Sequence, residues 1–158
     1  MIEKLDGDMQ TVFSLNDIEN VCFGKDAWSV RNLLSEFGNK FSHMYGAYEG
    51  ENLVGYACVR IMYEEAQVCN IAVLPQYRRR GIGTELVMAV IACAMENKCR
   101  YCELEVNTQN QEAIALYTKC GYQIAGIRKN FYRKTRYDSR DAYTMTLQLP
   151  NIEQENNE

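Results

Sequence analysis

The segment "NIAVLPQYRRRGIGTELVMA", residues 70–89, decides the fold. Apolar and β-branched residues predict a strand that ends at Leu74–Pro75, because proline cannot donate a hydrogen bond to a sheet. Three arginines, Gly81 and Gly83 follow, and an apolar stripe then predicts a helix over residues 84–98. A strand, a glycine turn and a helix start together present several backbone N–H groups at one point. The sequence therefore predicts an anion site in this turn.

The chemistry of this turn favours a bulky diphosphate as the anion. Gly81 and Gly83 let the backbone approach the ligand closely and tolerate positive φ, while the arginines add positive charge. The segment has neither the GK[ST] of a P-loop nor the GxGxxG of a dinucleotide fold. A nucleic-acid module would explain the arginines and the second basic cluster, residues 128–140. However, the net charge of −4 and the isoelectric point near 5.2 argue against nucleic acid as a partner.

The remaining patterns predict a mixed α/β order around this segment. Two short N-terminal helices are expected, one capped by Ser14 and one over residues 27–37, which contain Trp28. The further predictions are a hairpin from Phe41 to Tyr63 with a turn at 50–52, a turn at 64–67, strands over 68–74, 101–106, 122–130 and 141–149, and a helix over 110–121. Residues 1–149 are thus expected to form a single domain, and residues 150–158 a polar, disordered tail.

Composition sets outer bounds on class and compartment. At 158 residues the chain fits one domain, and 47% hydrophobic with 24% charged residues is typical of a globular protein. No apolar run reaches the roughly 18 residues of a membrane span, and no signal peptide is read, so we expect a cytoplasmic protein without a membrane partner. The seven cysteines are expected to be reduced core thiols. No metal is expected, since Cys99 and Cys102 form a single CxxC and His43 is the only histidine.

Two segments in order carry a family resemblance. Arg78-x-x-Gly81-x-Gly83, preceded by "NIAVLPQY" and followed by "LEVNTQNQEAIALYTKCGY", resembles the acetyl-CoA core of the GNAT N-acetyltransferase superfamily over residues 50–149. The stretches "DAWS", "LEV", "NxxAIALY" and "RKNFY…DAYTM" are similar to its RimI-type members, which acetylate ribosomal-protein N-termini. The loop in the last stretch lacks the usual Pro and Gly. The resemblance implies a mixed, mostly antiparallel central sheet, flanked by helices and splayed at the acetyl-CoA site.

The resemblance also assigns cofactor contacts to particular residues. It implies that backbone amides of Arg79 to Thr84 hold the CoA pyrophosphate, and that the main chain of Ile71 and Val73 pairs with the pantetheine arm. Asn110 would contact that arm. The predicted cofactor-binding residues are Ile71, Val73, Arg78, Arg79, Arg80, Gly81, Ile82, Gly83, Thr84, Asn110 and Tyr117.

The same resemblance names an acid and a base. Glu105 would act as general base, directly or through water, although strand alternation alone leaves Glu103 on the same face as an alternative. Tyr117 would protonate the departing CoA thiolate, although helical spacing alone also fits a core aromatic. Tyr77 and Tyr132 are predicted to line the substrate tunnel. Trp28 is predicted to pack or to line the peptide groove.

Together these features predict an acetyl-CoA-dependent N-acetyltransferase that acts on the N-terminal α-amine of a protein, with a ribosomal protein as a candidate substrate. A transferase for a lysine side chain or a small-molecule amine is the alternative within enzymes. A domain that binds acyl-CoA without catalysis is the alternative outside them. Both a monomer and a weak homodimer are compatible with the sequence.

Overall fold

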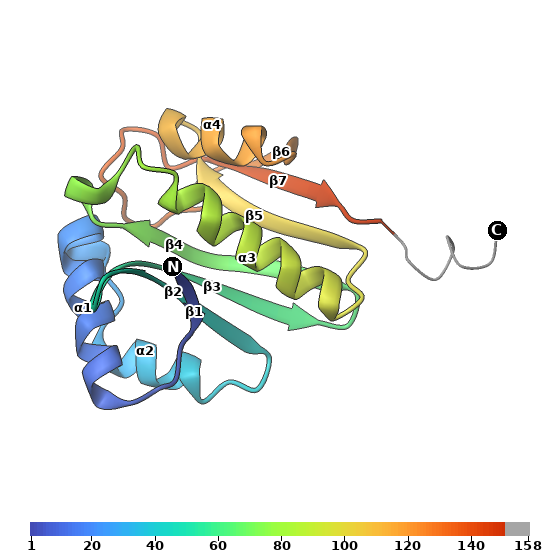
Figure 1. Ribbon diagram of the computed structural model, residues 1–158. Helices are drawn as coiled ribbons and strands as arrows, with labels where there is room; N and C mark the ends of the chain where they lie inside the picture. The colour runs from blue at the N-terminus through green and yellow to red at the C-terminus, as the bar shows by residue number, and fades with distance from the viewer. Residues whose placement is uncertain (151–158) are drawn as a thin grey trace. The chain divides into compact units, whose positions relative to one another are not determined.

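The computed structural model describes residues 1–150, so the polar tail predicted beyond Pro150 lies outside the described residues. Within residues 1–150 the strands form one seven-stranded sheet in the order β1-β2-β3-β4-β5-β7-β6 (Figure 1). β4 and β5 pair in parallel, whereas the pairs β1–β2, β2–β3, β5–β7 and β6–β7 are antiparallel. The predicted fold class, a mixed and mostly antiparallel sheet with flanking helices, is confirmed.

The elements follow the predicted order. The strands are β1 (Ile2–Lys4), β2 (Ser42–Glu49), β3 (Asn52–Met62), β4 (Glu65–Val73), β5 (Tyr101–Asn107), β6 (Gln123–Arg128) and β7 (Ala142–Gln148). The helices are α1 (Met9–Phe23), α2 (Val30–Phe37), α3 (Ile82–Glu96) and α4 (Gln111–Lys119), with short 3₁₀ turns η1 (Gly24–Asp26) and η2 (Pro75–Tyr77). No helix in residues 1–150 is both long and apolar enough to cross a membrane.

The chain divides into two compact units, which are described separately below. The first unit contains residues Met1–Arg60 and Cys69–Val90, and the second contains Ile61–Val68 and the chain from Ile91 onward. β4 and α3 each contribute residues to both units.

The first unit is built around the N-terminal helices and the β1–β3 strands. α1 begins earlier than predicted because the Asp8 carboxylate accepts a hydrogen bond from the Thr11 amide at 2.9 Å. The expectation that Ser14 caps this helix was wrong, since Ser14 lies inside it. α2 begins after Ser29, which forms a capping box with Asn32, so Trp28 precedes the helix rather than belonging to it. α1 and α2 pack together, and α2 lies beside β2 (Figure 1).

The second unit is centred on β5. Cys102, Leu104 and Val106 alternate along β5 as buried residues, and Met145 of β7 is fully buried as well. α4 ends at Lys119, two residues before the predicted end, and Gly121 follows with φ +102°, a conformation that glycine adopts readily after a helix.

Further differences from prediction concern β1, β4 and α3. β1 was not predicted, because three residues are too few to show a period. β4 begins at Glu65 rather than Val68, because the hairpin turn contains only Tyr63 and Glu64. α3 begins at Ile82, two residues before the predicted start. The helix therefore starts inside the glycine turn itself.

Candidate active site

The glycine turn of the first unit has the backbone conformation of an anion site. Arg79 and Gly81 both adopt positive φ, at +64° and +84°, immediately before α3. The Gly81 carbonyl accepts the first helical hydrogen bond from the Glu85 amide at 3.0 Å. A Cβ atom built on Gly81 would meet no atom within 4 Å, so glycine is needed here for its φ and not for space. Alternation of positive and negative φ turns successive N–H groups toward one side, which suits a phosphate.

The three arginines of this turn have different surroundings. Arg78 donates from Nε to the Val73 carbonyl at 2.9 Å and lies 3.8 Å from the Cys22 sulfur through Nη2. Arg80 lies over the Tyr77 ring, with 5.3 Å between its guanidinium carbon and the ring centroid. Arg78 therefore fixes the end of β4. Because it occupies the Val73 carbonyl, pairing of that carbonyl with a pantetheine arm would compete with Arg78.

Trp28 is held by α1 in the first unit. Its amide donates to the Glu19 carboxylate at 3.1 Å, and its carbonyl accepts from the Asn16 side chain at 2.9 Å. The ring packs against the core of the unit, in line with the predicted packing role. Glu19 is fully buried and also accepts hydrogen bonds from Tyr56 and Asn70. Burial raises the pKa of the Glu19 carboxyl.

In the second unit, Glu105 is oriented by two side chains. Gln67 of β4 donates from Nε2 to Oε2 of Glu105 at 2.8 Å. The Arg128 guanidinium lies 3.8 Å from Oε1, and the Glu105 side chain is 12% exposed. The carboxylate is thus directed by neighbours and only slightly open to solvent. Such a group can accept a proton from an amine or from an intervening water.

Two of the predicted site tyrosines, Tyr117 and Tyr132, belong to the same unit as this carboxylate. Burial, followed by the charges of Glu105 and Tyr137, raises the pKa of Tyr132 to about 12. Tyr117 is buried, and its pKa is raised by that burial and then by Tyr132. Its ring packs 5.8 Å from the Tyr122 ring. Beside burial, the Glu105 charge thus contributes to the raised pKa of Tyr132, and Tyr132 contributes to the raised pKa of Tyr117.

The connection after β5 anchors the loop that carries Tyr132. Asn107 donates to the Ser139 carbonyl at 2.8 Å, and the Ser139 amide donates to Gln109 at 2.8 Å. Asn110, a predicted cofactor contact, caps α4 by accepting from the Ala113 amide at 3.2 Å. The side chains at the end of β5 thus position the 129–141 loop.

The structure groups the predicted residues by unit. Trp28, Ile71, Val73, Tyr77 and the glycine turn belong to the first unit, and Glu105, Asn110, Tyr117 and Tyr132 belong to the second.

Gln67, Arg128, Asn107 and Glu19 were missed by the sequence analysis. The only signal for Glu19 is a carboxylate within the apolar stripe of α1, beside Leu15, Ile18 and Cys22.

One group of side chains in the described residues could be considered for a metal ion. The ligand atoms of Glu36, Cys58 and Cys69 lie within 4.8 Å of one another. Both oxygens of Glu36, however, accept hydrogen bonds from Arg60 at 2.7 Å, and a cation would have to displace this guanidinium. Cys99 and Cys102 are buried thiols outside this group, and Cys102 accepts a hydrogen bond from Tyr122 at 3.0 Å.

Comparison with known proteins identifies the family of the chain. The acetyltransferase (GNAT) family matches residues 12–122, which include the glycine turn, Glu105 and Tyr117. The chain belongs to this family. The predicted enzyme class, an acetyl-CoA-dependent N-acetyltransferase, is confirmed.

Several relatives carry names of the predicted RimI-type subgroup. The N-alpha-acetyltransferase RimI of Mycobacterium tuberculosis is 36% identical over 77% of this chain and 76% of its own length. The ribosomal protein bS18-alanine N-acetyltransferase of Escherichia coli is 33% identical over 77% of this chain and 81% of its own. The crystal structure of the S18-alanine enzyme from Escherichia coli is similar with a TM-score of 0.82 and 29% identity, over 94% of this chain and 92% of that one.

A GNAT acetyltransferase from Elizabethkingia anophelis with acetyl-CoA bound has a TM-score of 0.78, over 94% of this chain and 97% of that one. Its 21% identity supports the shared fold alone.

Proposed function

We propose that this enzyme transfers the acetyl group of acetyl-CoA to the N-terminal α-amine of a protein, and that a ribosomal protein is its substrate. The observation that carries the proposal is the 33–36% identity, over most of the chain, to relatives named for N-terminal or ribosomal-protein alanine acetylation. The pairing of Glu105 with Gln67 and Arg128 in the second unit supports it. Residues 1–149 would act as a single catalytic domain.

The glycine turn would bind the diphosphate of acetyl-CoA. Positive φ at Arg79 and Gly81 directs amides of the turn, and the positive end of the α3 dipole adds to their field. Arg79 and Arg80 would supply additional charge from an exposed position. Ile71 and Val73 would pair with the pantetheine arm through their main chain, and use of the Val73 carbonyl would require Arg78 to release it.

Glu105 would remove the proton from the attacking amine. An amine attacks a thioester carbonyl only when neutral, and an α-amine has a pKa of about 7.7–8.0. About a tenth of it is therefore neutral at pH 7 without help. Arg128 and Gln67 hold the Glu105 carboxylate in one orientation, so that it can accept the proton directly or through water.

Tyr117 would protonate the leaving sulfur. Its raised pKa keeps the proton on oxygen at neutral pH, but it also weakens Tyr117 as an acid toward a thiol of pKa about 8.5. The apolar surroundings that raise the pKa of Tyr117 would raise that of a thiol beside it. We therefore expect the proton to move as the carbon–sulfur bond breaks and not afterwards.

Tyr77, Tyr132 and Trp28 would contact the acceptor peptide. Tyr132 belongs to the 129–141 loop that Asn107 and Gln109 anchor, so this loop would present it in a fixed position. We expect a monomer or weak homodimer in the cytoplasm, without a metal, nucleic acid or membrane partner.

Peptide acetylation followed by intact mass tests the proposal. Peptides that begin with Ala, Ser or Met and contain an internal lysine are incubated with enzyme and acetyl-CoA. One acetyl group is expected on each, and prior blocking of the α-amine should abolish the product. Acetylation of lysine in the blocked peptides would replace the proposal with the lysine alternative. Transfer only to polyamines or aminoglycosides would replace it with the small-molecule alternative.

A further inference from the structure

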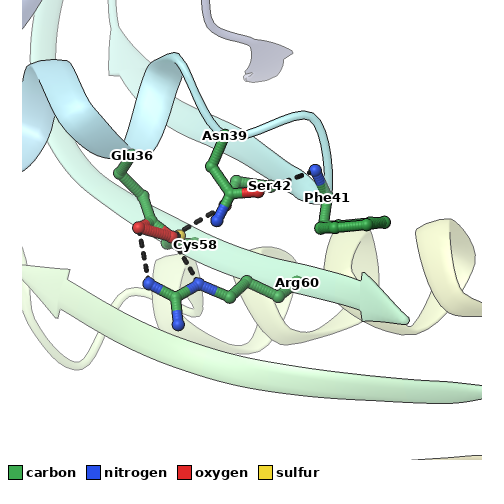
Figure 2. Close-up of polar contacts among 6 residues, drawn as sticks. All are labelled: Glu36, Asn39, Phe41, Ser42, Cys58 and Arg60. Carbon is green, nitrogen blue, oxygen red and sulfur yellow. Dashed lines mark hydrogen bonds and ion pairs between the residues drawn. The ribbon is translucent and has the colours of Figure 1, made fainter.

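Outside the residues discussed as catalytic, the first unit contains a compact polar cluster between α2 and the sheet. Figure 2 shows the Arg60 guanidinium pointing to the Glu36 carboxylate, where Nε and Nη2 each donate at 2.7 Å. Ser42 donates to the same carboxylate at 2.7 Å, and Cys58 lies 3.7 Å from it. Glu36 is 6% exposed and Cys58 is fully buried. The fifth member of this cluster is Cys69.

Cys58 and Cys69 occupy neighbouring strands that a short turn connects. β3 ends at Met62 and β4 begins at Glu65, so counting back from the two-residue turn places Cys58 opposite Cys69. Their sulfurs lie within 4.8 Å of each other. Directly opposed residues in an antiparallel pair have Cα atoms about 4.5–5.5 Å apart, inside the range that a disulfide spans. The two thiols can therefore be joined with little backbone movement.

The thiols of Cys58 and Cys69 differ in the direction of their pKa shifts and in their exposure. Hydrogen bonding to Cys69, burial and the nearby Glu36 charge all raise the pKa of Cys58. The same hydrogen bond, with Cys58 as donor, and the Arg60 guanidinium lower the pKa of Cys69. Cys69 is also half-buried where Cys58 is inaccessible. Reactive cysteines share this combination of partial exposure, positive charge and a neighbouring thiol.

We propose that Cys58 and Cys69 form a reversible oxidation site, in which Cys69 reacts with a peroxide and Cys58 closes a disulfide. The Cys69 thiolate attacks one peroxide oxygen, the O–O bond breaks, and sulfur loses two electrons to become a sulfenic acid. For hydrogen peroxide the departing hydroxide takes a proton and leaves as water. Cys58 then attacks the Cys69 sulfur, the S–O bond breaks, and hydroxide takes the Cys58 proton as a second water. A dithiol reductant returns both thiols.

The other five cysteines provide an internal comparison. Cys120 is half-buried like Cys69, but burial raises its pKa and it has no role in this cluster. Cys22, Cys93, Cys99 and Cys102 are buried. Exposure alone would therefore predict similar reactivity for Cys69 and Cys120, whereas the cluster predicts that Cys69 reacts first.

Limited oxidation of the full chain tests the proposal. Reduced protein is treated with one equivalent of hydrogen peroxide, digested without reductant and analysed by mass spectrometry. A Cys58–Cys69 cross-link, with the loss of two hydrogens, should form before any change at Cys120 and should disappear with dithiothreitol. Oxidation of Cys120 before Cys69, or a cross-link between other cysteines, would overturn the proposal.

Two variants assign the roles. In Cys58→Ser the Cys69 sulfenic acid should persist and react with dimedone, whereas Cys69→Ser should leave Cys58 unmodified. Absence of the dimedone adduct in folded Cys58→Ser, or efficient oxidation of Cys58 in Cys69→Ser, would contradict the assigned order.

Binding of zinc by the same side chains is the alternative to an oxidation site. One equivalent of Zn²⁺ retained by wild type after gel filtration, and lost in Cys58→Ser, would make this cluster a metal site instead. None of these readouts depends on acetyl transfer.

Discussion

The turn over residues 78–84 and the cluster around Glu105 differ in which chemical groups they present, backbone amides in the turn and side chains in the cluster. The turn would act through its backbone, because positive φ at Arg79 and Gly81 directs its amides, while Arg78 and Arg80 make contacts within the first unit. The cluster would act through side chains, because Gln67 and Arg128 contact the Glu105 carboxylate, and burial and the Glu105 charge raise the pKa of Tyr132. The comparison implies that backbone-changing substitutions should damage the turn, whereas conservative side-chain changes should damage the cluster.

The largest effect is expected for Tyr117→Phe, which removes only a hydroxyl. Loss of a general acid should lower kcat by roughly 10²–10⁴-fold. Affinity for acetyl-CoA should change little, since the ring remains. Single-turnover kinetics and calorimetric titration measure the two quantities. Near-normal turnover with reduced thermal stability would instead make Tyr117 a core aromatic packed against Tyr122.

The second largest effect is expected for Glu105→Gln. At pH 7 the loss of the base should lower kcat/KM by about 10–100-fold, because about nine tenths of an α-amine of pKa near 8 is then protonated. Raising the pH to 9 should recover part of the loss. A pH profile of kcat/KM on an N-terminal peptide measures this recovery, and a profile parallel to wild type would contradict the role of Glu105.

Glu103→Gln is the matched control, because Glu103 lies on the same strand and the sequence left it open as the base. The pKa of Glu103 is raised by burial and by the neighbouring charges of Glu105 and Glu65, while Arg128 opposes this shift. Its substitution should leave kcat/KM at pH 7 within about threefold of wild type, well below the effect of losing a general base. A large loss in Glu103→Gln alone would exchange the two roles.

Gly81→Ala should reduce acetyl-CoA affinity by about tenfold. A Cβ at φ +84° costs about 1–2 kcal/mol, and the turn can relieve this strain only by changing the φ that directs its amides. Gly50→Ala is the control, since Gly50 also has positive φ, at +61°, and open space, but lies in the β2–β3 turn. Both variants should lose similar thermal stability. Equal affinity in the two, measured by titration calorimetry, would remove the glycine turn from the binding site.

The difference between the turn and the cluster around Glu105 also explains which parts of the site could be predicted from the sequence. The turn is contiguous, and its glycines, the preceding proline and the following apolar stripe are visible in twenty residues, 70–89. Alternation along β5 left Glu103 and Glu105 on one face, and the family resemblance selected Glu105, but the contact of Glu105 with Gln67 joins residues 38 apart in sequence. Such pairings depend on strand register, which a single sequence does not specify. The cap at Asp8 was missed because Ser14 offered an equally good local signal.

The buried positions of Glu36 and Glu19 could not be predicted either, because they also depend on contacts between segments that are distant in the sequence. Glu36 meets Arg60 only because β3 packs beside α2, and Glu19 meets Tyr56 and Asn70 only because β3 and β4 pack beside α1. Their pKa values move in opposite directions, because the Arg60 guanidinium lowers the pKa of Glu36, whereas burial raises the pKa of Glu19 against the hydrogen bonds of its neutral donors.

Arg79 tests whether the turn works through its backbone or through its charge, with the smallest expected effect. Arg79 is exposed and has φ +64°, a conformation that costs a non-glycine residue about 1–2 kcal/mol. Arg79→Gly removes the charge but relieves this strain, whereas Arg79→Ala removes the charge and keeps the strain. If the amides carry the affinity, Arg79→Gly should bind acetyl-CoA within about threefold of wild type, since one exposed charge contributes less than about 1 kcal/mol. Its thermal stability should equal or exceed that of wild type, and Arg79→Ala should bind no better than Arg79→Gly. Titration with acetyl-CoA at low and high salt separates the contribution of the backbone amides from that of the Arg79 charge, because salt screens the contribution of the exposed charge. A loss of tenfold or more in Arg79→Gly that disappears at high salt would assign the phosphate affinity to the arginine side chain and remove the contrast between the two regions.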